Sequence, residues 1–342
     1  MKSDKPRPTF KTVKPSTAYA SPEELFYKLS RREKTHGYLR GPQQDVLREY
    51  VEKHADSRDV AFELPTGTGK TAVGLLVAEW KRLQSRKVAY LSLTNQLAGQ
   101  VLNEAGRLGI SCADLRGTKD TRDPSEVGRY KTGEAIAVTT YSNLFNIKPV
   151  LQECDLFVFD DAHGAEHYVT DMWSARTGKD AALYGSLLAA LRPALSDSQI
   201  RVILDKSAFA SVEVADVLGH QECIPNIVDV LDNATADSAR FAWRLIRHNV
   251  MSCLFLVSPI EIVVRPLVPP TYTHAPFESS KQRIYMSATL GGESDLQRAY
   301  GVGKLHMVRA KSRNGGVGTF LFRVFMLLRA TLSRSSPRFG MA

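Results

Sequence analysis

Cysteine is scarce in this chain, and its spacing excludes several kinds of site. The 342 residues contain four cysteines, at positions 112, 154, 223 and 253, and no two of them form a Cys-x-x-Cys pair. A disulfide framework needs many cysteines, and zinc and iron–sulfur sites need closely spaced ones. We therefore expect reduced thiols, no zinc and no iron–sulfur cluster.

Long apolar runs are also absent. No stretch of 18 uncharged apolar residues occurs, and the N-terminus lacks the apolar core of a signal peptide. We expect no membrane span, no membrane partner and a cytoplasmic location. The apolar content of 43% is ordinary for a globular protein that buries a core.

Acidic residues are missing from the C-terminal end, so the net charge of +9 is unevenly placed. Residues 1–20 contain five Lys/Arg and one acid, and residues 296–342 contain nine Lys/Arg and no acid. Residues 21–295 therefore carry about −4. Basic ends can add phosphate affinity, but charge runs are more often only solvated. The net charge alone does not predict a nucleic-acid-binding protein.

A glycine-rich segment carries the strongest functional signal. It reads Leu64-Pro65-Thr66-Gly67-Thr68-Gly69-Lys70-Thr71, between a strand-like run and an apolar helix-like run. Strand, glycine loop and helix are the context of a phosphate-binding loop, whose glycines aim backbone N–H groups at the phosphates. We expect Pro65 to Thr71 to bind ATP, with Lys70 on the β- and γ-phosphates and Thr71 on Mg²⁺.

Two carboxylates follow a buried-strand pattern further along. The segment reads Leu156-Phe157-Val158-Phe159-Asp160-Asp161-Ala162-His163. Acids at the carboxyl end of a hydrophobic strand are where α/β nucleotide sites hold Mg²⁺. We expect Asp160 to bind the metal and Asp161 to activate water; the alternative is that both acids cap the next helix.

With these two motifs, the chain resembles the N-terminal RecA-like motor domain of a superfamily 2 (DEAD/DEAH-box) helicase, in which Asp160-Asp161-Ala162-His163 would be motif II. Five further segments resemble motifs of that family in the family's order. They are Leu39–Gln44 (the Q motif), Leu93–Gln100 (motif Ia), Arg116-Gly117-Thr118 (a glycine turn), Thr139-Thr140-Tyr141 (motif Ib) and Ser287-Ala288-Thr289 (motif III). The resemblance covers residues 36–165 and 280–302.

The resemblance implies further site residues. Gln43 would read the adenine edge. Thr94, Gln100 and Thr140 would contact the backbone of DNA or RNA. His163, Ser287 and Thr289 would couple hydrolysis to nucleic-acid contact.

Two departures from the family pattern bear on activity. Asp161 stands where the family usually has Glu, so its carboxylate is one methylene shorter. The Gln-x-x-Gly-Arg-x-x-Arg run of a second motor domain does not occur either, so an arginine finger worth roughly 10³–10⁵ in rate is missing. A second subunit could supply that finger.

The pattern predicts an α/β fold, namely a RecA-like P-loop domain with a parallel sheet and a helical insertion between motifs II and III. Strands are expected at 60–63, 88–93, 135–139 and 156–159, and helices at 42–54, 72–84 and 95–107. The predicted parts are a disordered basic tail (1–20), the ATP-binding domain (21–169 and 276–302), the insertion (170–275) and a basic tail (303–342).

The insertion and the last tail admit more than one interpretation. Helical spacing at 181–195, 212–218, 224–231 and 238–251 resembles the arch region of iron–sulfur superfamily 2 helicases, although the four metal-binding cysteines are missing. The acid-free tail is either truncated or out-of-frame coding, or a genuine basic, amphipathic segment that docks a partner or RNA.

Three functions are compatible with the sequence. The chain is a helicase or translocase ATPase that hydrolyses Mg·ATP, a non-hydrolysing module whose binding to nucleic acid or protein depends on ATP, or a decayed helicase fragment.

Overall fold

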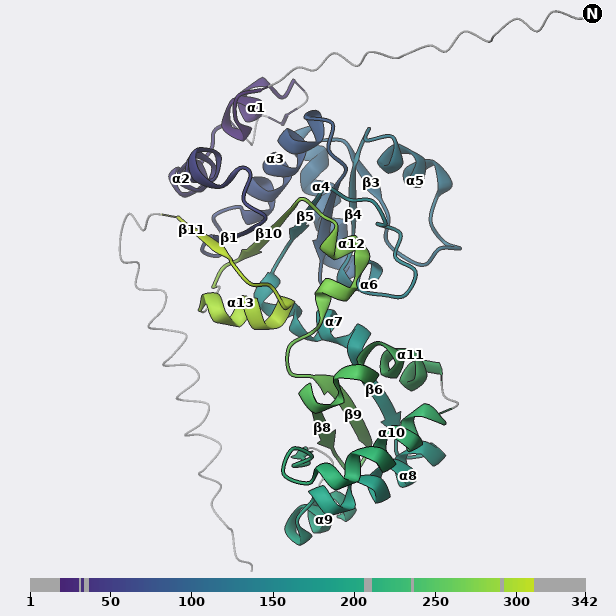
Figure 1. Ribbon diagram of the computed structural model, residues 1–342. Helices are drawn as coiled ribbons and strands as arrows, with labels where there is room; N and C mark the ends of the chain where they lie inside the picture. Colours follow the sequence, from purple (N-terminus) through teal and green to yellow (C-terminus); the bar gives the residue numbers. More distant parts are fainter. Residues whose placement is uncertain are drawn as a thin grey trace, which may run out of the picture.

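The computed structural model describes residues 19–30, 32–33, 37–205, 211–234, 237–289 and 292–310. These residues form a parallel seven-stranded sheet and a separate antiparallel four-stranded sheet (Figure 1). In this part of the chain, no helix is both long and apolar enough to cross a membrane. The predicted tails at 1–20 and 303–342 fall largely outside it.

The larger sheet confirms the predicted α/β class. Its order is β11-β1-β10-β5-β2-β4-β3, and every neighbouring pair is parallel. The strands are β1 (Asp59–Glu63), β2 (Val88–Ser92), β3 (Cys112–Asp114), β4 (Ile136–Thr140), β5 (Leu156–Phe159), β10 (Gln282–Ser287) and β11 (His306–Arg309). The four predicted strands lie within one residue of β1, β2, β4 and β5, while β3 and β11 were missed.

Helices cover both faces of this sheet because successive strand residues point to opposite sides. Val60 and Phe62 of β1 belong to one buried cluster, whereas Ala61 belongs to the other. The first cluster includes residues of α1 (Pro22–Lys28), α2 (Gly41–Glu49), α3 (Lys70–Leu83) and α4 (Asn95–Leu108). The second includes residues of α5 (Pro124–Lys131), α6 (Tyr141–Leu144), α7 (Glu166–Thr170), α12 (Ala275–Glu278) and α13 (Glu293–Tyr300).

Helix α4 illustrates how local sequence sets the bounds of an element. The Thr94 hydroxyl accepts a hydrogen bond from the backbone N–H of Leu97 at 3.2 Å, which caps the N-terminus. Gly109 ends the helix with φ +70°. Ala98, Val101, Ala105 and Leu108 are buried at helical spacing. The prediction of a helix over 95–107 is therefore confirmed.

The insertion between β5 and β10 contains a sheet as well as helices. Its helices are α8 (Ala182–Leu191), α9 (Asp197–Leu204), α10 (Ile224–Asp232) and α11 (Asp237–Ile246), and its strands are β6 (Ala175–Gly178), β7 (Glu213–Val214), β8 (Cys253–Val257) and β9 (Glu261–Pro266). The antiparallel order is β6-β9-β8-β7. The purely helical prediction for this segment was therefore incomplete.

One predicted helix of the insertion, 212–218, was wrong. Val214 pairs with Leu256 of β8, and the Ala215 N–H donates to the Phe255 carbonyl at 3.0 Å. A seven-residue apolar pattern is too short to separate a helix from a strand, and here cross-strand pairing decides.

The insertion is joined to the domain of the seven-stranded sheet by a shared core. Trp173, Phe145 and His274 pack against one another, with the ring centroids of Trp173 and Phe145 6.2 Å apart. One continuous buried cluster runs from β5 through these rings to Leu187 and Ile227 of α8 and α10. Figure 1 shows the insertion extending from the side of the sheet that carries α7 and α13.

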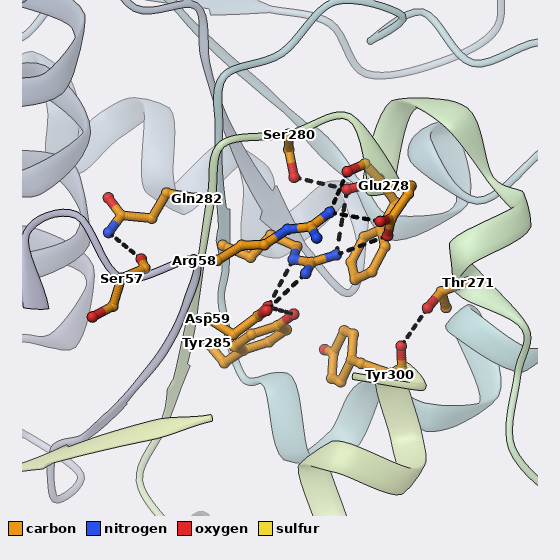
Figure 2. Close-up of polar contacts among 11 residues, drawn as sticks. Ser57, Arg58, Asp59, Thr271, Glu278, Ser280, Gln282, Tyr285 and Tyr300 are labelled. Carbon is orange, nitrogen blue, oxygen red and sulfur yellow. Dashed lines mark hydrogen bonds and ion pairs between the residues drawn. The ribbon is translucent and has the colours of Figure 1, made fainter. Parts of the chain in front are cut away.

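A buried ionic cluster fixes the amino ends of β1 and β10 (Figure 2). The Arg283 guanidinium places Nη2 2.7 Å from Oδ2 of Asp59 and Nε 2.7 Å from Oδ1, and both side chains are under 8% exposed. The Tyr285 hydroxyl donates to the same carboxylate at 2.8 Å. The Arg283 guanidinium also lies 4.3 Å from the ring centroid of Phe277 in α12.

Substituting Arg283→Met is expected to destabilise the fold strongly. Removing one partner of a buried ion pair leaves an uncompensated charge, here on Asp59, at a cost of about 3–5 kcal/mol. Urea unfolding measures the loss. Arg48→Met is the control, because Arg48 pairs with Glu23 at the surface, where exposed pairs contribute little. Equal losses for the two variants would contradict a special role for the buried pair.

The stability of the fold should decrease in mild acid because of His274. The imidazole is 5% exposed, its Nε2 lies 2.9 Å from the Leu144 carbonyl, and burial lowers its pKa. The unfolded chain takes up a proton near pH 6.5 while the folded chain does not, so stability falls as the pH drops below that value.

Unfolding by urea at pH 7.5 and pH 5.5 measures this loss. His274→Gln keeps a side-chain N–H donor but does not titrate. The decrease in its free energy of unfolding between pH 7.5 and pH 5.5 should therefore be smaller than that of the wild type. An unchanged loss in the variant would exclude His274 as the cause.

Candidate nucleotide site

The predicted motifs lie together because the strands that carry them are parallel neighbours. Glu63 of β1 pairs with Ser287 of β10, and Tyr285 of β10 pairs with Phe159 of β5. The Leu64 N–H also donates to the Ser287 carbonyl at 3.0 Å. The glycine loop, motif III and motif II therefore leave the sheet at the same edge, where α/β proteins bind ligands.

The glycine loop has the backbone that a phosphate site requires. Gly67 and Gly69 adopt φ +77° and +82°, which residues with a side chain rarely adopt. The Thr68 hydroxyl donates to the Pro65 carbonyl at 2.6 Å and closes the loop. Exposed residues of the loop are Pro65, Thr66, Gly67 and Gly69, and Lys70 begins α3. The N-terminus of α3 therefore lies directly after the loop. No acidic residue in its first turn offsets the partial positive charge of the helix dipole there.

Gln43 lies against this loop. Its Oε1 accepts a hydrogen bond from the Arg40 N–H at 2.8 Å, and its Nε2 donates to the Gly69 carbonyl at 3.4 Å. A Cβ on Gly69 would lie 2.6 Å from that Nε2, so Gly69 is needed for the close approach as well as for its φ. The Arg40 guanidinium donates to the Gly67 carbonyl at 2.5 Å.

Lys70 and Asp161 meet across the site although they are 91 positions apart. Lys70 Nζ lies 2.5 Å from Asp161 Oδ1, and the two side chains are 16% and 45% exposed. Asp161 has φ +51°, a left-handed conformation that Asp tolerates better than most residues with a side chain. The loop lysine and the second motif II acid therefore neutralise each other.

Asp160 is held from several sides. Its Oδ2 accepts a hydrogen bond from the Tyr90 hydroxyl at 3.0 Å, and its Oδ1 accepts one from the Asp161 N–H at 3.0 Å. The Tyr141 hydroxyl donates to the Asp160 carbonyl at 2.9 Å. Burial, followed by the charge of Asp161, raises the pKa of Asp160 to about 6. The two hydrogen bonds fix the carboxylate in one orientation.

The oxygen donors at this site fit Mg²⁺. A carboxylate from Asp160 and a hydroxyl from Thr71 are hard ligands, and Mg²⁺ usually takes one or two protein carboxylates together with phosphates and water. Among the described residues, no group of three or more His, Cys, Asp or Glu side chains could hold a metal ion. One carboxylate and one hydroxyl would suit a metal whose remaining ligands are phosphate oxygens and waters.

The predicted coupling residues, His163, Ser287 and Thr289, are only partly connected to one another, unlike Lys70 and Asp161. His163 is exposed in a 3₁₀ turn (Ala162–Ala165), and the Ser287 hydroxyl donates to the Thr289 carbonyl at 3.0 Å. Within residues 156–170 and 282–289, all of which are described, no hydrogen bond joins His163 to Ser287 or Thr289. Their coupling role stays a prediction.

Of the predicted nucleic-acid residues, Thr94 and Thr140 lie at the carboxyl ends of β2 and β4, and Gln100 lies in α4. Thr94, the N-cap of α4, and Gln100 are exposed, whereas Thr140 is 9% exposed. Beside them, a cavity of about 510 Å³ is lined by Asn95, Asp114, Arg116, Gly117, Thr121, Arg122, Asp123 and Glu126. Arg116 is paired with Asp114 at 2.6 Å. Thr94 and Gln100 therefore offer more surface for contact than Thr140.

Nothing in the sequence indicated the site contacts of Tyr90, Tyr141 and Arg40, although Tyr141 and Arg40 lie within predicted motifs. Tyr90 reads only as a buried strand residue, since its hydroxyl contact depends on β2 lying beside β5. Arg40 precedes the predicted Gln43, but nothing in its spacing indicates a bond to Gly67. These partners become visible only once the sheet order is known.

Residues 41–175 match the family model "DEAD/DEAH box helicase". No curated protein matches the chain significantly in sequence.

Similar solved structures carry the titles "XPD_Helicase" (15% identity, TM-score 0.44), "XPD_APO" (17%, 0.46) and "Structure of S. tokodaii Xpd4" (14%, 0.45). These matches cover 80%, 85% and 87% of this chain, and 62%, 58% and 69% of the respective structures. This chain thus spans about three fifths of the length of the first two.

Tyr90→Phe should weaken Mg²⁺-dependent nucleotide binding while the fold is kept. The variant removes only the hydroxyl that donates to Asp160 Oδ2. Losing a partner that orients a metal ligand typically costs 10–100-fold in metal affinity. The readout is the Mg²⁺ concentration that half-saturates binding of a fluorescent ATP analogue.

The matched control is Tyr130→Phe, whose lost hydroxyl donates to the Glu153 carbonyl away from the site. If the Mg²⁺ titration of Tyr90→Phe overlays that of the wild type, the Tyr90 hydroxyl does not contribute to Mg²⁺ binding through Asp160.

Proposed function

We propose that this chain, whose residues 41–175 match the DEAD/DEAH box helicase model, binds Mg·ATP and couples its hydrolysis to movement along nucleic acid or to its unwinding. The observation that carries the proposal is the meeting of Lys70 and Asp161 at 2.5 Å. It brings the loop lysine and the motif II carboxylates to the same edge of the sheet.

The residues of the site divide the chemistry between them. Lys70 exchanges Asp161 for the β- and γ-phosphates when nucleotide enters, and the loop N–H groups after Gly67 bind phosphate oxygens. Thr71 and Asp160 hold Mg²⁺, which neutralises charge on the phosphates when bound. The exchange frees Asp161 to orient or deprotonate the attacking water.

Gln43 contributes base recognition. Its amide uses one N–H on Gly69 and one lone pair on Arg40, which leaves one donor and one acceptor for the adenine edge. Because Gln43 also contacts the loop, adenine binding and loop conformation would be linked.

Nucleic acid would be contacted by the carboxyl ends of β2 and β4. Thr94, Gln100 and Thr140 would bind the backbone, which carries no base information and so fits DNA or RNA equally. We further propose that a second subunit supplies the arginine finger that completes hydrolysis.

A non-hydrolysing ATP-dependent binding module is the second candidate function. It is favoured by Asp161, whose carboxylate is one methylene shorter than the usual Glu and is already paired with Lys70. A misplacement of about 1 Å in a catalytic group can cost on the order of 10²-fold in rate. Such a protein would bind Mg·ATP and change its partner affinity without turnover.

ATP turnover by the whole chain, with and without single-stranded DNA or RNA, tests the proposal. The wild type should hydrolyse ATP faster with nucleic acid, and Lys70→Ala should abolish both turnover and tight nucleotide binding. Lys131→Ala, at the end of α5 and remote from the loop, is the charge-matched control and should behave like the wild type.

The outcomes separate the candidate functions. Lysine-dependent binding without turnover would favour the non-hydrolysing module. If the wild type does not bind nucleotide, or if Lys70→Ala leaves binding unchanged, both candidate functions are contradicted and a decayed fragment is favoured.

A further inference from the structure

We propose that Tyr300, the last residue of α13, is a positioning residue that holds motif II and ties it to both connectors of the insertion. The inference rests on the proposed function, since it concerns how Asp160 is presented to Mg²⁺. Neither the glycine loop nor motifs II and III include Tyr300.

The Tyr300 side chain is fully buried beside motif II. Its ring lies 5.3 Å from that of Phe159 and 4.7 Å from that of Tyr285, measured between centroids. Its hydroxyl lies 3.2 Å from the Ala162 carbonyl and 3.3 Å from the Tyr141 hydroxyl. The single phenolic proton is therefore shared between two acceptors, both close to Asp160.

Tyr141 extends this contact to the predicted metal ligand. The Tyr141 hydroxyl donates to the Asp160 carbonyl at 2.9 Å, so its own oxygen is available to accept from Tyr300. The backbone on both sides of Asp161 is thus held by two phenols. This matters because Asp161 has φ +51°, and the turn that places both carboxylates needs support.

Helix α13 is fastened to the segment that leads into the insertion. The Arg298 guanidinium donates to both oxygens of Glu166, the first residue of α7, at 2.7 and 2.9 Å. Glu166 comes five positions after Asp161, so the same helix contacts motif II and the connector that follows it. The bidentate geometry fixes the orientation of α13 on α7.

Helix α13 is also fastened to the segment that returns from the insertion. The Thr271 hydroxyl donates to the Tyr300 carbonyl at 2.6 Å (Figure 2). Gly301 follows with φ +60°, and a Cβ there would overlap the Pro269 carbonyl oxygen. A displacement of either connector is therefore transmitted to Tyr300, and from Tyr300 to the turn at Asp160.

Tyr300→Phe tests the role of the hydroxyl because the ring packing is kept. The Mg²⁺ concentration that half-saturates binding of a fluorescent ATP analogue to the full chain should rise about tenfold, as for other groups that orient a metal ligand. Thermal unfolding should remain cooperative. Tyr285→Phe is the matched control, since it removes a neighbouring buried hydroxyl that bonds Asp59 instead. It should lower the melting temperature and leave the Mg²⁺ dependence unchanged.

Two results from the tyrosine variants would overturn the inference. One is an unchanged Mg²⁺ dependence of nucleotide binding in Tyr300→Phe. The other is an equal shift in Tyr285→Phe, which would indicate general loosening of the core. If Tyr300→Phe does not fold, Arg298→Met decides, because this partly exposed pair can be broken without cavity formation. Arg298→Met should raise the half-saturating Mg²⁺ concentration about threefold, because it removes only part of the support for motif II. If the concentration does not rise, the inference is rejected.

A wild type that binds the analogue without any Mg²⁺ dependence would instead contradict the proposed function, and the inference with it.

Discussion

The parallel pairing of β1, β10 and β5 is the constraint on which the rest of this molecule depends. It carries three segments, up to 224 positions apart along the chain, to the same edge of one sheet. The Lys70–Asp161 pair follows from that register, and the Tyr90–Asp160 contact follows from the neighbouring pairing of β5 with β2. At the amino ends of the strands, the buried pair between Asp59 and Arg283 joins β1 to β10.

Asp161 shows how a short side chain and an unusual backbone conformation fit each other. The turn after β5 places this residue in the left-handed region, where Asp is better tolerated than Glu. The carboxylate nevertheless reaches Lys70, because the residue lies close to the start of α3. A departure from the family pattern that looks like a defect in the sequence is, in the folded chain, a well-paired group.

The parts of the fold that were predictable are those in which one local signal dominates. The buried run at Leu156–Phe159 and the apolar spacing of α4 were read correctly because each fills a single face or layer. The hairpin of β8 and β9 was missed although a turn at Ser258-Pro259 separates an apolar run, Cys253–Val257, from a run with three β-branched residues, Glu261–Pro266, which is a readable signal. Partners such as Tyr90 and Tyr300 could not be predicted, since a phenol's contact depends on which strand lies beside which.

The insertion shares its buried interior with the domain of the seven-stranded sheet, because Trp173 and Phe145 belong to one cluster with the residues of α8 and α10, and His274 packs against both rings. Domains joined only by a flexible linker can be cut apart or exchanged between proteins. Here the cut would expose aromatic rings on both pieces. Evolution or protein engineering could therefore replace the tip of the insertion, beyond α8 and α10, more easily than the insertion as a whole.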